Sequence, residues 1–175
     1  MEGARTGTIV LVAEDDPHAL SGYVEFLSTA GFVAYGRGNG RDALSTALEI
    51  IPDIVVTDIA MPGLDGFGLA AALRADSLTK DVPIVGMTAH WTAETQSEGQ
   101  RAGFSAMLLK PCTPTHLLAE IERVQKQKHA ELIAAEIGGE TNGSPSPTAF
   151  VEARVEPAVP VGLRNAVLRR RGVDY

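Results

Sequence analysis

The chain has few of the features that mark secreted or membrane proteins. Its 175 residues include a single cysteine, Cys112, so no disulfide can form within the chain, which suits a reducing compartment. No apolar run approaches the ~18 residues of a membrane span, and no charged start leads into an apolar segment like that of a signal peptide. We therefore expect a soluble cytoplasmic protein without a membrane partner.

Positive charge is also scarce. The chain has 15 basic and 22 acidic residues, for a formal charge of −7, whereas a general nucleic-acid binder usually carries a basic patch or stripe. The charge is uneven, because residues 1–137 carry a net charge of −8 and residues 138–175 a net charge of +1. We therefore do not expect nucleic acid to be a partner of this protein.

Apolar residues make up 45% of the chain and are grouped in short runs. Such runs lack polar alternation and are typical of strands that are covered on both faces of a parallel sheet. The expected strands are residues 8–13, 32–35, 53–57, 82–87 and 106–109.

Segments with helical spacing lie between these runs. The expected helices are residues 17–30, 42–51, 67–74, 92–102 and a last one that begins at Pro114. Thr113 is a suitable N-cap for the last helix, with proline in its first turn. Five strands alternating with five helices predict an α/β fold, a doubly wound (βα)₅ parallel sheet with helices on both faces.

The end of the chain differs in composition from the rest. We expect one domain at residues 7–127, with residues 128–137 extending its last helix up to Gly138-Gly139. Residues 138–148 are rich in Gly, Ser, Pro and Thr, which is typical of a linker. Residues 138–175 as a whole are predicted to be a linker and a flexible tail, in which Leu163, Val167 and Leu168 could contact a partner.

Carboxylates follow two of the expected strands at the point where each strand ends. Glu14 and Asp15 follow the first strand, and Asp58 follows the third. Ligands of doubly wound sheets bind at the carboxyl ends of the strands, and the three carboxylates converge there if the two strands are adjacent. Like charges this close need a cation, and oxygen ligands favour a hard divalent ion such as Mg²⁺.

A hydroxyl and an ammonium group end the fourth and fifth strands. Thr88 lies in "GMTAH" and Lys110 in "LLKP". Together they could hold the oxygens of a phosphoryl group on Asp58, since phosphoryl transfer depends on positioning and on neutralising charge.

Four motifs carry a resemblance to the receiver domain of two-component response regulators, of the chemotaxis-regulator type. They are "LVAEDD", "VVTDIAMPGLDG", "PIVGMTA" and "LLKP", in this order. The resemblance implies a flavodoxin-like sheet with strand order 2-1-3-4-5 and transfer of a phosphoryl group from phosphohistidine. The implied partners are a sensor histidine kinase or histidine phosphotransfer protein, and a downstream target bound by the fourth helix, fifth strand and fifth helix.

The resemblance implies a role for each site residue. Asp58 is the implied phosphoacceptor, Asp15 a direct ligand of Mg²⁺, and Glu14 an outer, water-bridged acid. The main-chain carbonyl of Ala60 is a further implied metal ligand. Thr88 is the implied switch hydroxyl, and Lys110 is the implied lysine that pairs with the phosphate. A cis peptide bond is implied before Pro111.

Two positions bear on the switch and on loss of the phosphoryl group. Met107 stands where the family often has an aromatic ring that turns inward with the switch threonine, so the aromatic form of the switch is not expected here. His90 lies two residues after Thr88, beside the path implied for attacking water, and could equally be a solvated loop residue.

Two other functions compete with that of a relay or protein-binding receiver, which would catalyse only its own phosphorylation and dephosphorylation. A haloacid-dehalogenase-type phosphatase needs a second Asp two residues after its nucleophile, where this chain has Ala60. A DNA-binding regulator would need its output in the segment after Ile137, which is short for a helix-turn-helix domain, although it contains Arg169, Arg170 and Arg171.

Overall fold

The computed structural model describes residues 7–137. The strands are β1 (Ile9–Ala13), β2 (Val33–Arg37), β3 (Ile54–Asp58), β4 (Ile84–Thr88) and β5 (Ala106–Leu109). The helices are α1 (Pro17–Thr29), α2 (Gly40–Ile50), α3 (Gly66–Ala75), α4 (Ala93–Arg101) and α5 (Pro114–Ile137). The predicted alternation of five strands and five helices is confirmed, with differences of a few residues at the ends of the elements.

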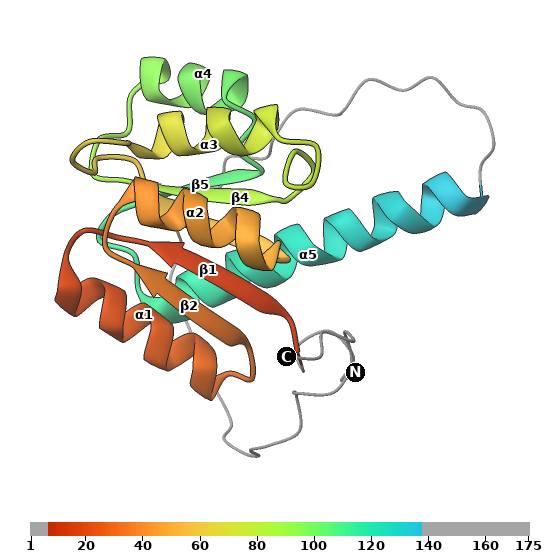
Figure 1. Cartoon of the computed structure of the whole chain (residues 1–175), viewed down its shortest axis with the longest axis horizontal. Helices are drawn as coiled ribbons and strands as arrows, with labels where there is room; N and C mark the ends of the chain where they lie inside the picture. The colour runs from red at the N-terminus through yellow and green to blue at the C-terminus, as the bar shows by residue number, and fades with distance from the viewer. Residues whose placement is uncertain (1–6, 138–175) are drawn as a thin grey trace.

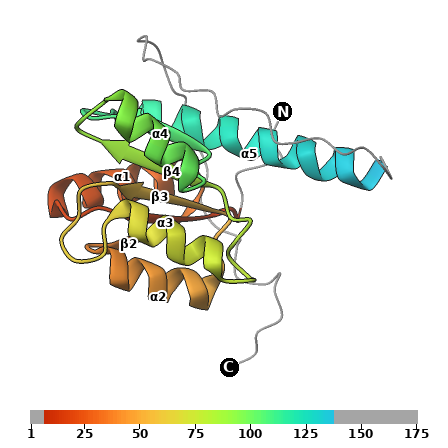
Figure 2. The same ribbon diagram turned by 90° about the horizontal axis from the view of Figure 1, so that it is seen from above.

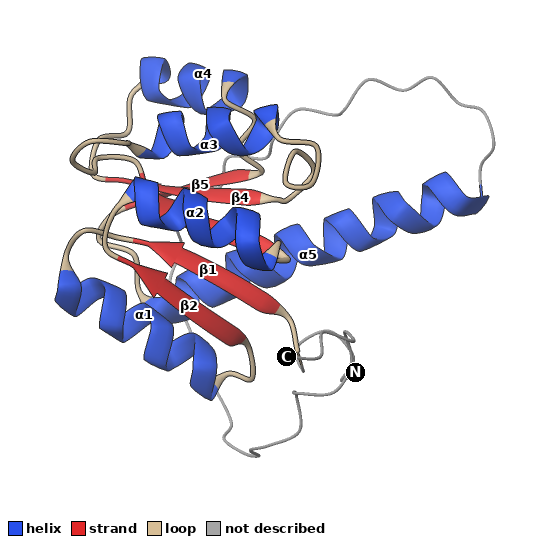
Figure 3. Ribbon diagram, in the orientation of Figure 1, coloured by secondary structure: helices blue, strands red, loops and turns tan. Residues whose placement is uncertain are grey.

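All neighbouring strands pair in parallel, in the order β2-β1-β3-β4-β5 (Figure 3). The predicted doubly wound, flavodoxin-like sheet is therefore confirmed. The register places Ala13 beside Thr57 and Asp58 beside Met87. As a result, the residues that follow β1, β3 and β4 meet at one edge of the sheet.

Helices cover both faces of the sheet (Figures 1 and 2). Val10 and Val12 of β1 pack into a core with α1 and α5, whereas Leu11 and Ala13 pack into a second core with α2 and α3. Because both faces are buried, every position of these strands favours an apolar residue, which explains the continuous apolar runs.

Side-chain caps fix where the helices begin. The Asp16 carboxylate accepts a hydrogen bond from the amide of Ala19 at 2.7 Å and caps α1. Asn39 caps α2 in the same way, so this helix begins at Gly40, two residues before the predicted start.

The long helix α5 extends past the rest of the domain (Figures 1 and 2). The ammonium of Lys128 donates a hydrogen bond to the main-chain carbonyl of Asp81, and residues 129–135 are exposed. Among the helices described, none is both long enough and apolar enough to cross a bilayer. The linker and tail expected at 138–175 lie outside the described residues.

Candidate functional site at the carboxyl edge of the sheet

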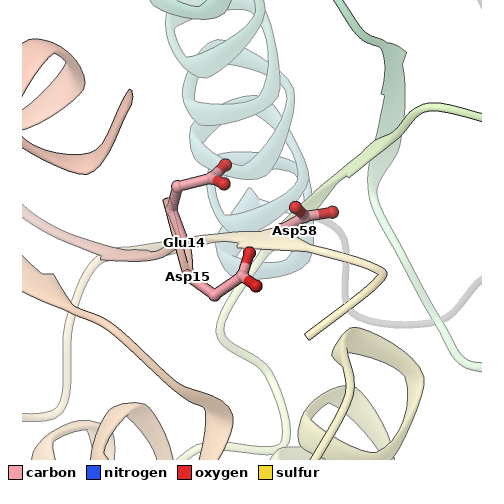
Figure 4. Close-up of side chains that lie close together, drawn as sticks. All are labelled: Glu14, Asp15 and Asp58. Carbon is pink, nitrogen blue, oxygen red and sulfur yellow. The ribbon is translucent and has the colours of Figure 1, made fainter. Parts of the chain in front are cut away.

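Three carboxylates converge where β1 and β3 end (Figure 4). One carboxylate oxygen from each of Glu14, Asp15 and Asp58 lies within 4.8 Å of the others. Glu14 and Asp58 are buried, with 1% and 6% of their surface exposed, whereas Asp15 is exposed. The cluster therefore opens to solvent on the Asp15 side.

Lys110 partly neutralises this cluster. Its ammonium donates to Oε2 of Glu14 at 2.7 Å and to Oδ2 of Asp58 at 2.5 Å. Burial by itself lowers the pKa of Lys110, but the hydrogen bonds and charges of Asp58 and Glu14 outweigh burial and raise this pKa above its ordinary value. Lys110 therefore stays protonated and joins the two buried carboxylates.

Glu14 is the carboxylate of the cluster whose ionised form is disfavoured by its surroundings. Burial raises the pKa of the Glu14 carboxyl, and the neighbouring charge of Asp58 raises it further, against the hydrogen bond from Lys110. Its second oxygen, Oε1, accepts a long hydrogen bond of 3.4 Å from the amide of Asp16. One cation thus leaves the acidic group with unbalanced negative charge, which a further cation would relieve.

The main chain around Asp58 is held tightly against α3. The amide of Ala60 donates to Oδ1 of Asp58 at 3.1 Å, so both carboxylate oxygens of Asp58 accept hydrogen bonds. Gly66 begins α3 directly behind this residue, and a Cβ atom there would lie 2.4 Å from the carbonyl oxygen of Asp58. A side chain at position 66 would therefore displace the end of β3.

Thr88 is turned toward its own loop. Its hydroxyl donates to the carbonyl of His90 at 3.0 Å and accepts from the amide of His90 at 3.1 Å. Thr88 is buried, with 4% of its surface exposed, and its carbonyl accepts the amide of Lys110 at 2.7 Å. The structure thus brings Thr88 to the same edge as Lys110, with the hydroxyl engaged by main-chain atoms.

Two residues that support the site were missed by sequence reasoning. Gly66 lies inside the "MPGLDG" motif, but only the close approach of α3 to β3 reveals its role. Tyr23, on α1, donates its hydroxyl to the carbonyl of Cys112 at 2.9 Å and so ties α1 to the loop after Lys110. Its signal in the sequence was only that of an apolar position on a helix.

The surroundings of Lys110 also agree with two smaller expectations. The peptide bond between Lys110 and Pro111 is cis. Met107 is buried beneath α4, where a Cβ atom on Gly99 would lie 2.1 Å from its Sδ atom. An inward-pointing side chain thus fills the space at position 107 without an aromatic ring.

The donor set fits a hard divalent cation. Three carboxylates offer oxygen atoms within 4.8 Å of one another, and one of them, Asp15, faces solvent. Mg²⁺ is commonly held by one or two carboxylates together with water molecules and phosphate, which matches a pocket that is open on one side. The cluster can therefore hold a metal ion.

Comparisons with known proteins agree on the family. The model of the response regulator receiver domain matches residues 10–122. The transcriptional regulatory protein PrrA of Mycobacterium tuberculosis is 33% identical over 128 residues, which cover 73% of this chain and 54% of PrrA. The phosphate regulon regulatory protein PhoB of Pseudomonas aeruginosa is 27% identical, over 69% of this chain and 53% of PhoB.

Solved structures give the same result. The chemotaxis response regulator CheY4 of Vibrio cholerae is 31% identical, with a TM-score of 0.65, and the match covers 68% of this chain and 99% of CheY4. This chain spans about half the length of the curated transcriptional regulators that it matches. The shared region is thus the (βα)₅ domain that carries the carboxylate cluster.

Proposed function

This chain belongs to the response regulator receiver family, and from that premise we propose that Asp58 is its phosphoacceptor. A histidine kinase or a histidine phosphotransfer protein supplies the phosphoryl group, and the modified chain changes its affinity for a downstream protein. One observation carries the proposal: Asp58 is a buried carboxylate at a strand end, bonded to Lys110 and grouped with two further acids.

The transfer joins Asp58 to phosphorus in a single displacement. An oxygen of Asp58 forms the O–P bond, the N–P bond of the donor phosphohistidine breaks, and the electron pair stays on the imidazole nitrogen. Lys110 already contacts Oδ2 of Asp58 and can pair with a phosphoryl oxygen after the transfer. The amide of Ala60, bonded to Oδ1, keeps the carboxylate oriented at the end of β3.

A divalent cation, Mg²⁺ in our proposal, completes the charge balance. Asp15, Asp58 and the main-chain carbonyl of Ala60 would hold it directly, with Glu14 in an outer position. When bound, it would neutralise charge on the phosphoryl oxygens. Exposed Asp15 and exposed Ala60 lie on the solvent side of the cluster, which supports entry of the ion from that side.

The response passes through Thr88 to one edge of the sheet. A phosphoryl group on Asp58 offers acceptor oxygens for the Thr88 hydroxyl, which then leaves the main chain of His90. That loop leads directly into α4. Leu109 on the edge strand β5 is 46% exposed, which supports a protein partner at the surface made by α4, β5 and α5.

The proposed activity is signalling with self-catalysed gain and loss of the phosphoryl group. Ala60 cannot act as the acid or base that a haloacid-dehalogenase-type phosphatase needs two residues after its nucleophile. The names of PrrA and PhoB show that related receivers serve transcription. For this chain, a salt-dependent DNA-binding assay separates a DNA-binding output from the protein-binding output that we propose.

Replacement of the acceptor tests the proposal. The Asp58→Asn variant should lose all labelling by a small acyl phosphate or phosphoramidate donor, because an amide cannot form the acyl phosphate. Labelling of the parent chain should need Mg²⁺, and hydroxylamine should release the label. Asp42→Asn, an exposed carboxylate at the start of α2, is the matched control and should label normally. Full labelling of Asp58→Asn would assign the acceptor elsewhere.

A further inference from the structure

A groove of about 750 Å³ lies between α3 and α4, away from the carboxylate cluster. Phe67 and Ala71 of α3 and Ala102 after α4 give it an apolar floor. The ring of Phe67 packs edge-on against Phe104, with 5.7 Å between ring centroids, so the floor of the groove packs against the core. The groove is therefore a formed feature of the domain surface.

The α4 side of this groove is acidic. Glu94 and Glu98 lie one turn apart on α4, line the groove and are exposed. Among residues 7–137, neither carboxylate has an ion-pair partner. Arg101 lies at the other end of the helix. The groove thus has an apolar floor, a negative end and a positive end.

The chain itself contains a segment of matching chemistry. Residues 163–171 read "LRNAVLRRR", with four arginines and no acid, in a chain whose first 137 residues carry a net charge of −8. Leu163, Val167 and Leu168 are spaced so that a helix would place them on one side. The basic cluster is at one end of the segment, as the acidic pair is at one end of the groove.

We propose that residues 163–171 bind in the groove between α3 and α4 of the same chain. The apolar residues contact Phe67 and Ala71, and the arginines at positions 169–171 lie against Glu94 and Glu98. In this orientation the start of the segment, which carries only Arg164, faces Arg101, so like-charge repulsion is weaker than in the reverse orientation.

The length of the intervening chain permits this contact. Residues 138–162 supply 25 residues of chain between α5 and this segment, and a flexible tether of that length would have a root-mean-square span of about 25–30 Å. A domain of about 120 residues has a radius of gyration of about 14 Å, so the tether can pass around the edge of the sheet. Tethering gives an effective concentration of roughly millimolar, so even a weak contact is populated.

The bound segment would cover α4, which is part of the partner surface in the function proposed above. The resting receiver would then have part of its signalling surface occupied by its own end. This consequence rests on the proposed function, whereas the contact itself needs neither a phosphoryl group nor Mg²⁺.

The contact can be detected with a spin label near the end of the full chain. Val173→Cys provides the attachment site, and the native Cys112 reacts slowly because it is buried and burial raises the pKa of its thiol to about 11. In the unphosphorylated protein at low salt, the label should broaden the amide signals of Phe67 and α4 more than those of α1. The control is the same protein with the label reduced.

Charge reversal then tests the pairing. Reversal of all three arginines (Arg169→Glu, Arg170→Glu and Arg171→Glu) should remove the excess broadening, and the same reversal combined with Glu94→Arg and Glu98→Arg should restore it. Each exposed pair is expected to change the occupancy constant by a factor of roughly 1.5 to 5. Glu25→Arg and Glu49→Arg, exposed on α1 and α2, are matched controls and should change nothing.

Three results would overturn the proposal. Equal broadening of α1 and α4, or broadening that survives arginine reversal, would show that the segment has no site on this groove. If a spin label on one chain broadened the amide signals of another chain but not those of its own, the contact would be with a second copy of the chain. Arginine-dependent binding to duplex DNA without broadening of α4 would assign the segment to nucleic acid. None of these results depends on labelling of Asp58, so the proposed function stands or fails separately.

Discussion

Lys110 lies between two buried carboxylates at the carboxyl edge of the sheet, whereas Arg74 and Lys128 at the opposite edge donate to main-chain carbonyls. Arg74 bonds the carbonyls of Lys80, Val82 and Gly103 at 2.7–2.8 Å, just before β4 and β5 begin. Lys128 bonds the carbonyl of Asp81. The two edges of the sheet therefore hold half-buried cations in two different ways.

The difference appears in the titration of the three cations. Carboxylate partners raise the pKa of Lys110 despite its burial. Burial lowers the pKa of Arg74 and of Lys128, and the nearby acidic charges, of which Asp81 acts most strongly on both, do not compensate for it. The carboxylates carry negative charge that another cation could balance, whereas the main-chain carbonyls carry no net charge. The carboxyl edge thus has uncompensated negative charge that could hold a further cation, whereas the cations of the opposite edge bind neutral main-chain groups.

Removal of Lys110 should cause the largest loss of stability. Lys110→Met leaves Glu14 and Asp58 buried together without a cation, and such a loss costs about 3 kcal/mol of unfolding free energy near neutral pH. Urea unfolding in chelator measures this cost.

The pH dependence of the Lys110→Met variant has a definite sign. Burial already raises the folded-state pKa of Glu14 above its ordinary value, and loss of Lys110 should raise it further. A raised carboxyl pKa favours the folded state at low pH, and this benefit disappears as pH rises through the folded value. The variant should therefore regain stability on acidification or with added Mg²⁺, and an equal deficit under all conditions would contradict the role of uncompensated charge.

Removal of Arg74 should give a loss of different character. Arg74→Met keeps the apolar stem and leaves three carbonyls without their donor, which should cost about 2–3 kcal/mol. Neither acid nor Mg²⁺ should restore this stability, and folded protein should still be labelled at Asp58. Unfolding curves with and without Mg²⁺ at two pH values decide the matter; recovery with the metal would mean that the two edges are not independent.

The smallest expected change in stability is that of Asp15→Asn. This variant should bind Mg²⁺ at least about tenfold more weakly, because loss of a residue that only supports a metal ligand already lowers metal affinity by about that factor. In chelator it should be slightly more stable than the parent, because one of three clustered charges is gone.

Asp16→Asn is the matched control for Asp15→Asn. Asparagine caps a helix as well as aspartate, so α1 should keep its start. Calorimetric titration with Mg²⁺ should give the parent affinity for this control. An unchanged affinity in Asp15→Asn would place the ion elsewhere.

The sequence was sufficient to predict the sheet and the meeting of the site residues. Continuous apolar runs reveal strands that are buried on both faces, and parallel strands bring their carboxyl ends to one edge, so Glu14, Asp58 and Lys110 could be grouped from their positions alone. The strand order required the resemblance to a known family, because several orders satisfy the same apolar pattern.

Side-chain direction and local packing could not be predicted. Thr88 was expected at the site, but the two bonds that hold its hydroxyl to His90 depend on the path of the loop. The packing of Met107 beneath Gly99 and the groove between α3 and α4 depend on how two helices approach each other. Such contacts arise between residues whose separation along the chain carries no periodic signal.

The position of Lys110 along the chain has a consequence for synthesis of the protein. Lys110 bonds residues that lie 96 and 52 positions earlier, and it follows β5, the last strand of the sheet. A nascent chain that has emerged only as far as β4 therefore presents Glu14 and Asp58 without their ammonium partner. Docking of β5 supplies an edge strand and the missing cation in one step. Completion of the five-stranded sheet and neutralisation of the carboxylate pair are thus the same event.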